Sequence, residues 1–493
     1  MAESNPRSVL LSLRKRTTDM KNERERLLRQ ITDLDATLAE VDAQCDLITN
    51  ELIPISSLPN EILGEIFVAG SNSCGLQRNT FNISICQVSA HFRSVALNTP
   101  GLWKTLHLTI LNPWHTEMAA AYLLRSGTLP VDLRIHMTGT MRPNVLVSIH
   151  STIQVLKPHI KRWRKLYIHC TWHFGVLEFL DRLKRLGAPL LERIDVHARL
   201  RSPGLTDSVG NIFAGGTPSL KHVRLLGIPL QCCLPDLATV TNLRIHSGWV
   251  HTPFNYDDFY RMLSTLPLLT HLVVDSQLEP RIAGDPIYEL SSLRSLVLRG
   301  AHCWSVLCAV SAPCLQSLVV DSVQYEHLTP YLTSLESGNS SRFPMLRSLT
   351  LCQCENPGFT SSKWTSVMRA FPAIEEFTFS YLAVEDFLEA VRAGCFSSSN
   401  GSVWWPELHT LTLSNHLSPT TIRPNMLRVT IESRTLDKHP IKKLRLSNSI
   451  ISALGEEAEW LREHVELEAC EVYPTPASDR LVDWSYGEKW TDH

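Results

Sequence analysis

The residues in this chain whose types could do chemistry are its 20 histidines and 13 cysteines, which can bind metal ions or pair as base and nucleophile. Their spacing argues against a metal site, because no C-x-x-C pair occurs. Cys232 and Cys233 are adjacent, and Cys352 and Cys354 are separated by one residue. We therefore expect reduced, mostly buried thiols, no bound metal and no cofactor.

Sequence motifs of nucleotide binding, nucleophilic hydrolysis and zinc catalysis are also missing. The chain contains no G-x-x-x-x-G-K-[ST], no G-x-G-x-x-G, no G-x-S-x-G and no H-E-x-x-H pattern. We predict that the chain is not an enzyme. A hydrolase site assembled within its repeats is the remote alternative.

A second set of polar residues recurs at alternate positions of short apolar stretches, and its pattern suits binding rather than catalysis. Side chains alternate between the two faces of a strand, so these residues are expected to share one face. The candidate target-binding residues on that face are Arg193, His222, Arg224, Arg244, His246 and His271, with Asp195, His197, Asn242 and Asp275 beside them. The basic, histidine-rich set could capture an acidic or phosphorylated segment of another protein. The alternative is an ordinary solvated strand face.

The stretches that hold these residues share the spacing apolar-x-x-apolar-x-apolar. Ten copies occur, at 191–196, 220–225, 240–245, 269–274, 293–298, 315–320, 346–351, 374–379, 408–413 and 441–446. Their starts span 250 residues, a mean interval near 28. A proline often stands two positions before the first apolar residue, where it would end a helix and precede a strand. Helical patterns lie between the copies, for example at 256–266, 364–370 and 384–393.

This period resembles that of leucine-rich repeats. The resemblance implies one strand and one helix per unit, stacked in parallel into a curved solenoid. The usual Asn or Cys eight positions after the first apolar residue occurs only as Cys354, so we expect an irregular horseshoe with loops of unequal length. The related fragments 103–108 and 163–168 are expected to form irregular first turns that join it to the preceding segment.

Residues 57–108 have a different pattern, which begins L-P-N-E-I-L-G-E-I-F at Leu58. Pro59 and Glu61 suit the first turn of a helix. Ile85, Val88, Phe92 and Val95 then follow at +3, +4 and +3, which predicts a second helix that stops near residues 99–100. The segment resembles the F-box, in the form common among fungal F-box proteins. So small a unit buries too little surface to be stable alone.

The F-box resemblance implies a three-helix module that docks onto the Skp adaptor of a cullin ubiquitin ligase. By matching positions, the docking surface and its supporting core would comprise Leu58, Pro59, Ile62, Leu63, Ile66, Phe67, Val88, Phe92, Val95 and Trp103. Two departures are Phe92, where most members have Trp, and Ser89-Ala90-His91 in place of a Cys and a basic pair. The implied function is substrate recognition in a Skp–cullin–F-box ligase, with the solenoid holding a protein target. A protein-interaction scaffold outside a ligase is the alternative.

The first 53 residues are rich in charge and form a heptad pattern. Apolar residues alternate at +3 and +4 from Leu10 to Leu52, interrupted at Thr17 and Arg24, with no Pro or Gly between Arg7 and Ile53. This pattern predicts a helix. Self-association of two chains through residues 10–52 and a single helix lying on its own domain are both open interpretations.

The fold class expected from these patterns is α/β: a long N-terminal helix, a three-helix F-box and an irregular leucine-rich-repeat solenoid. The expected segments are 1–53 (amphipathic helix), 54–108 (F-box), 109–190 (connector with irregular first repeats), 191–472 (solenoid) and 473–493 (acidic tail). A net charge of −2 and the absence of a long apolar run predict no nucleic-acid partner and no membrane span. With no secretory signal pattern, we expect a cytoplasmic or nuclear protein.

Overall fold

The structure is a computed structural model, and it comprises two compact units, Met1–Leu102 and Trp103–His493. It describes residues 6–52, 54–110, 114–137, 145–171, 173–198, 211–228, 234–246, 256–275, 287–299, 304–321, 325–336, 341–352, 359–380, 384–396, 404–414 and 424–470. The tail expected at 473–493 and the repeat residue Cys354 lie outside these ranges.

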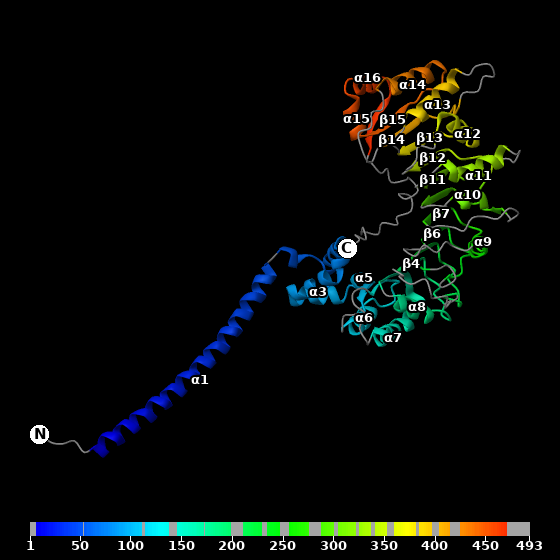
Figure 1. The fold of residues 1–493 in the computed structure, drawn as a ribbon. Coiled ribbons are helices and arrows are strands. Elements are labelled where there is room, and N and C mark those ends of the chain that lie inside the picture. Colours follow the sequence, from blue (N-terminus) through cyan, green and yellow to red (C-terminus); the bar gives the residue numbers. More distant parts are fainter. Residues whose placement is uncertain are drawn as a thin grey trace. The chain divides into compact units, whose positions relative to one another are not determined.

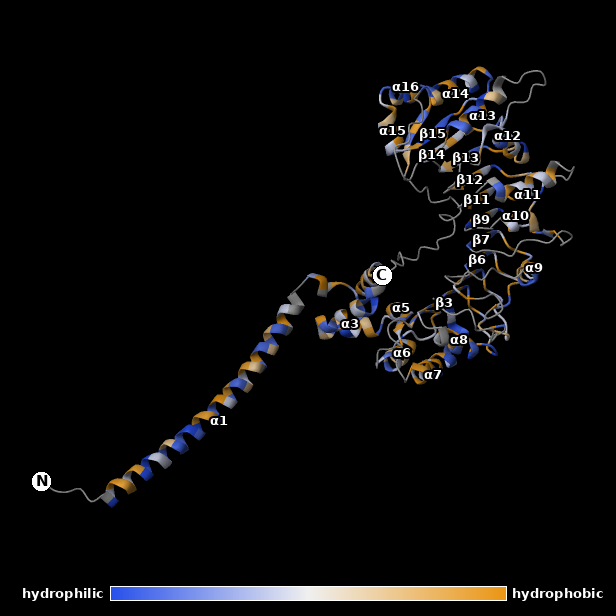
Figure 2. Ribbon diagram, in the orientation of Figure 1, coloured by the Kyte–Doolittle hydropathy of each residue, from blue (hydrophilic) through white to orange (hydrophobic). Residues whose placement is uncertain are grey.

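The first unit begins with α1 (Pro6–Leu52), a single helix of 47 residues. Apolar residues recur along its whole length (Figure 2), as the heptad pattern predicts. Every side chain that the structure describes in this helix is exposed to solvent. The helix is therefore not packed on its own domain within the described part of the chain.

Short helices follow α1 and form the helical module, residues 54–102. They are the 3-10 helix η1 (Pro54–Ser57), α2 (Asn60–Ser73), the 3-10 helix η2 (Gly75–Gln77), α3 (Arg78–Val88), α4 (Ala90–Leu97) and α5 (Pro100–Trp103). The prediction of one helix through 85–95 was wrong, because Ser89 interrupts it. Ser89 has extended backbone angles (φ −156°, ψ 166°), and its hydroxyl accepts the Phe92 amide N–H at 3.1 Å as the cap of α4.

The second unit is built on a fourteen-stranded, all-parallel sheet whose strands follow chain order. The strands are β1 (Thr105–Thr109), β2 (Val131–Met137), β3 (Trp163–Cys170), β4 (Arg193–Ala198), β5 (His222–Leu226), β6 (Asn242–His246), β7 (His271–Asp275), β9 (Ser295–Arg299), β11 (Ser317–Asp321), β12 (Ser348–Cys352), β13 (Glu376–Ser380), β14 (Thr410–Ser414), β15 (Lys443–Ser447) and β16 (Glu466–Cys470). A separate small parallel pair joins β8 (Tyr288–Glu289) to β10 (Val310–Ser311).

Helices alternate with the strands and lie along one side of the sheet (Figure 1). They are α6 (His115–Arg125), α7 (Val145–Leu156), the 3-10 helix η3 (Lys157–Arg162), α8 (His173–Asp181), α9 (Tyr256–Ser264), α10 (Trp304–Ala309), α11 (Tyr325–Glu336), α12 (Ser361–Ala370), α13 (Glu385–Phe396), α14 (Pro424–Leu436), α15 (Asn448–Leu454) and α16 (Glu457–His464). This order of parallel strands and helices is consistent with a leucine-rich-repeat-like solenoid.

The apolar residues of the repeated spacing form the core between sheet and helices. In β9, for example, Leu296 and Leu298 are both 0% exposed, and their neighbours on adjacent strands occupy the same register. Burying one such side chain contributes about 1.5–3 kcal/mol to the free energy of folding. A repeated gain of this size stabilises a sheet whose strands each contact only their neighbours.

The sheet is longer than the repeat pattern indicates. The ten expected copies are β4 to β7, β9 and β11 to β15, and the fragment 163–168, expected to be an irregular first turn, lies in β3. The segment expected to hold irregular first repeats and a connector, 109–190, also supplies β2 in the same sheet. The fragment 103–108 supplies β1, so the first unit ends at Leu102 rather than at residue 108. The strand β2 had a usable signal, since Val131, Leu133, Ile135 and Met137 alternate with polar residues.

Candidate interaction surfaces

Parallel, in-register pairing stacks the predicted target-binding residues into rows across β3 to β7. We call this face the open face and define it by the strand residues in register with Arg193, Asp195 and His197. One row reads Arg193, His222, Asn242, His271, and the next reads Tyr167, Asp195, Arg224, Arg244. Five of the six candidates therefore lie in two adjacent rows. His246 lies in the third row, level with Asp275.

Arginine side chains surround the carboxylate of Asp195 on this face. Arg224 Nη1 lies 3.4 Å from Asp195 Oδ2, and the next strand repeats the arrangement with Arg244 Nη2 at 3.5 Å from Asp275 Oδ2. Arg193 also acts electrostatically on Asp195. The three cations outnumber the two carboxylates that they meet, so the cluster is net positive.

An aromatic ring on the neighbouring strand extends this cluster. The Cζ atoms of Arg134 and Arg193 lie 5.1 Å and 5.7 Å from the centroid of the Tyr167 ring. Both distances are within the range of cation–π attraction. Burial raises the pKa of Tyr167 to about 12, so its hydroxyl keeps its proton at neutral pH. Sequence reasoning missed Arg134 and Tyr167, although both occupy alternate positions of β2 and β3.

The cluster is largely buried but its hydrogen bonding is incomplete. Arg193 and Asp195 are 6% and 8% exposed. Among the described residues, Arg224 Nε, His222 Nδ1 and the Tyr167 hydroxyl have no hydrogen-bond partner. A buried polar atom without a partner costs about 1–3 kcal/mol. A ligand that supplied acceptor atoms here would recover part of that cost.

Two histidines of the open face, His222 and His271, do not add positive charge at neutral pH. Burial, with Arg193 and Lys221 nearby, lowers the pKa of His222 to about 4. Burial also lowers the pKa of His271, reinforced by Arg294. In the basic, histidine-rich patch that the sequence predicts, the positive charge therefore comes from arginine, while His222 and His271 are neutral hydrogen-bonding groups.

At β7 the middle row of the open face changes from charged to apolar residues. In the row of Arg224 and Arg244, the next residues are Val273, Val297 and Val319, which form one buried cluster. Threonines continue the row in β12 to β14. The arginine cluster is thus confined to one stretch of the sheet.

The helical module has a second surface of interest, on α2. Ile62 and Ile66 lie one turn apart, so they share a face of the helix, and they are 51% and 45% exposed. Val88, at the end of α3, is 62% exposed. Leu58 is half-buried and Pro59 is exposed at the start of the same segment. Branched apolar side chains thus remain in water on a module of about fifty residues.

Other residues assigned to this surface lie in the core of the module. Leu63, Phe67 and Val95 are 0%, 4% and 5% exposed, and the ring of half-buried Phe92 lies 5.1 Å from that of Phe67. Gly64 allows the close approach, because a Cβ atom there would lie 2.9 Å from Thr99 Oγ1. Leu63, Phe67 and Val95 can support a docking surface but are too buried to contact a partner, whereas Phe92 keeps part of its surface in solvent.

Trp103 does not belong to the module. It is 2% exposed at the start of the second unit, where its ring meets that of Tyr122 edge-on at 4.9 Å. The Cζ atom of Arg125 lies 4.7 Å from the Trp103 ring centroid. Trp103 is therefore withdrawn from the docking surface, since these contacts bury it against α6.

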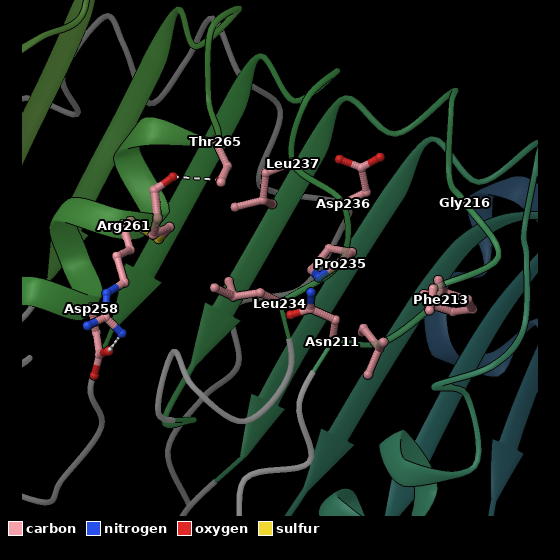
Figure 3. A pocket seen from close by; sticks show the side chains of 13 residues that line it. Asn211, Phe213, Gly216, Leu234, Pro235, Asp236, Leu237, Asp258, Arg261 and Thr265 are labelled. Carbon is pink, nitrogen blue, oxygen red and sulfur yellow. Dashed lines mark hydrogen bonds and ion pairs between the residues drawn. The ribbon is translucent and has the colours of Figure 1, made fainter.

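A hollow of about 640 Å³ lies between helix α9 and the two loops that precede β5 and β6 (Figure 3). Apolar groups such as Phe213, Leu237 and Met262 line it. At one side, Arg261 Nη1 and Asp258 Oδ1 are 3.9 Å apart. The lining has no nucleophile with an adjacent base, so it offers no arrangement for catalysis.

Neither a metal site nor a membrane-spanning helix is present among the described residues. No group of three or more His, Cys, Asp or Glu side chains is placed to hold a metal ion there. No helix in the same part of the chain is both long and apolar enough to cross a bilayer. Comparison with protein-family models and with curated proteins gives no match for this chain.

Proposed function

We propose that this chain is a substrate-recognition adaptor of a Skp–cullin–F-box ubiquitin ligase. In this proposal the helical module is the F-box that docks the Skp adaptor, and the sheet unit is an irregular leucine-rich-repeat horseshoe that holds a protein target. The chain would accelerate ubiquitin transfer by bringing the target close to the ligase, with no catalytic residue of its own.

The observation that carries the proposal is the exposed pair Ile62 and Ile66 on α2. They belong to the L-P-N-E-I-L-G-E-I-F segment, and the module beneath them buries Leu63 and Phe67. Exposed branched apolar residues on so small a module mark a surface that another protein can cover. The F-box resemblance names that protein as the Skp adaptor.

Co-purification of the full chain with a Skp adaptor tests this proposal. The double variant Ile62→Asp with Ile66→Asp should lose the adaptor, because two carboxylates would be desolvated at the interface. Both side chains are exposed in the free chain, so the module should still fold. A variant at Phe67 would not serve, since Phe67 lies in the core.

A matched control replaces two exposed leucines of the sheet unit, Leu124→Asp and Leu436→Asp, which are 81% and 82% exposed. This control should retain the adaptor. Retention of the adaptor by the α2 double variant would contradict the docking face. A wild-type chain that binds no Skp adaptor would instead favour an interaction scaffold outside a ligase, an alternative that the exposed seam of α1 also fits.

The target-binding role is assigned to the arginine cluster of the open face. Charge reversal by Arg224→Glu with Arg244→Glu should abolish recovery of an acidic or phosphorylated target while leaving adaptor binding unchanged. The control Arg428→Glu with Lys438→Glu makes the same change in charge on and after α14. Unchanged target recovery by the Arg224 and Arg244 variant would leave the open face as an ordinary strand face.

A further inference from the structure

The helix α1 exposes an apolar seam, interrupted only at Thr17 and Arg24, that no described residue of the chain covers. Nine apolar residues of the heptad seam are between 47% and 68% exposed: Leu10, Leu13, Met20, Leu27, Ile31, Leu34, Leu38, Val41 and Ile48. At ~1.5 Å per residue the 47-residue helix is about 70 Å long. A stripe of this length and 3-4 spacing is suited to a second helix of the same kind.

Charge is segregated between the two halves of α1. Residues 7–26 contain seven Lys or Arg and three Asp or Glu, a net charge of +4. Residues 27–52 contain one Arg and six Asp or Glu, a net charge of −5. A helix with this distribution is complementary to a reversed copy of itself and repels a copy that runs in the same direction.

We propose that α1 pairs with α1 of a second copy of the chain as an antiparallel two-stranded coiled coil. This pairing is independent of the proposed ligase role. The +3 and +4 steps place Leu10, Thr17, Arg24, Ile31, Leu38, Cys45 and Leu52 at the a positions of the heptad, and Leu13, Met20, Leu27, Leu34, Val41 and Ile48 at the d positions.

A parallel pair is disfavoured by residues at the seam and beside it. In parallel pairs the a positions face each other, so Arg24 would meet Arg24 of the second copy. The flanking g and e positions would bring Arg16 against Lys21 of the second copy, and the parallel register pairs no flanking cation with an anion. Repulsion at the a positions and at the flanking e and g positions therefore opposes the parallel arrangement.

The antiparallel pair resolves these conflicts, because a positions then face d positions. The register with the greatest overlap sets Leu10 against Ile48 of the second copy and Arg24 against Leu34 of the second copy, so the two Arg24 side chains lie in different layers. Facing e positions then pair Arg14 with Asp42 and Lys21 with Asp35, each twice by symmetry. Four ion pairs of opposite charge flank the seam.

Antiparallel pairing of α1 would hold the rest of the two chains far apart. The two chains leave the rod after Leu52 at opposite ends, roughly 70 Å apart. Each copy then presents its own open face, and a target with two binding segments would gain avidity only if it spans that separation.

Sedimentation equilibrium of the full chain at low ionic strength tests the pairing. Arg14→Glu with Lys21→Glu should weaken the dimer by about 10- to 100-fold, since four attractive contacts become repulsive. Adding Asp35→Lys and Asp42→Lys to the same chain should restore it. Lys15→Glu with Arg29→Glu, at outward f positions, makes the same change in charge and should leave the dimer unchanged.

Two outcomes would overturn the proposal. In a parallel pair Lys21→Glu replaces a repulsion with an attraction, so tighter association of the first variant would show parallel pairing. A wild-type chain that sediments as a monomer at every concentration would show that α1 does not pair with a second copy.

Cross-linking of the full chain gives an independent measure of orientation. The antiparallel register sets Leu13 against Cys45 of the second copy, so Leu13→Cys should form a dimer with a short bis-maleimide linker, and added Cys45→Ser should abolish it. In a parallel pair Cys45 faces itself. Cross-linking of the wild-type chain that Cys45→Ser removes would therefore overturn the antiparallel assignment.

Discussion

The helical module and the sheet unit differ in how far they bury their branched apolar side chains. On α2, Ile62 and Ile66 remain about half exposed, whereas Leu296 and Leu298 on β9 are completely buried. Each inner strand has a neighbour on both sides and helices on one face, so its core is completed within the chain. The module has too few residues to cover its own apolar surface. The array thus closes its core within the chain, whereas the exposed apolar residues of the module support the proposal that a partner covers them.

Replacing one branched apolar side chain by alanine in each region tests this comparison most strongly. Leu296→Ala should lower the free energy of unfolding of the sheet unit by about 2–5 kcal/mol, because it leaves a cavity in a closed core. Ile66→Ala should cost less than about 1 kcal/mol. Residues 1–102 contain no tryptophan, so tryptophan fluorescence reports the sheet, and hydrogen exchange of α2 amides reports the module. Similar losses at both positions would contradict the comparison.

Arg434 is a buried polar side chain that finds its hydrogen-bond partners within the sheet unit. This side chain is 0% exposed and donates hydrogen bonds to the carbonyl oxygens of His439, Trp404, Trp405 and Leu408. Arg434→Met should destabilise the sheet unit by about 2–3 kcal/mol, because these acceptors lose their donor. Urea unfolding followed by fluorescence measures the loss. The exposed Arg428→Met on the same helix is the control, with an expected cost below about 1 kcal/mol.

Within the module, the cap at Ser89 should have a smaller effect. Ser89→Ala removes the acceptor of the Phe92 amide and should destabilise α4 by about 1 kcal/mol. This destabilisation should appear as faster hydrogen exchange at the first amides of α4 than in the wild-type chain. Ser94→Ala, within the same helix, should leave their exchange unchanged. If the first amides of α4 exchange at the same rate in both variants, the cap does not define the break between α3 and α4.

The effect that is smallest at neutral pH concerns His222 and the stability of the sheet unit in acid. The pKa of His222 is about 4 in the folded chain and ordinarily 6.5. The unfolded chain therefore binds a proton more readily, and His222 should lower the free energy of unfolding as pH falls from about 6.5 to 4. His222→Gln should flatten the dependence of the sheet unit's Tm on pH in that range. His91→Gln, outside the sheet, is the control, and an unchanged slope in His222→Gln would contradict the assignment.

The strands and the long helix were predictable because their signals are local. Repeated apolar spacing located ten strands near their observed positions, and the heptad pattern located α1, since each depends on residues a few positions apart. The break at Ser89 was missed because the +3 and +4 spacing continues through it, and only the backbone at Ser89 reveals the cap. The burial of Trp103 was not predictable, because its neighbours in sequence do not show that its ring packs on Tyr122.

By itself the sequence determined the order of the elements, the alternation that puts Arg193 and Asp195 on one face, and the opposite charges of the two halves of α1. Only the tertiary structure decided which residues share a row, that Tyr167 lies beside Arg193, and which apolar residues of the module stay in water. The reason is physical: periodicity is set by bonds along the chain, whereas register, burial and the pKa of His222 depend on groups that are distant in sequence and meet only after packing.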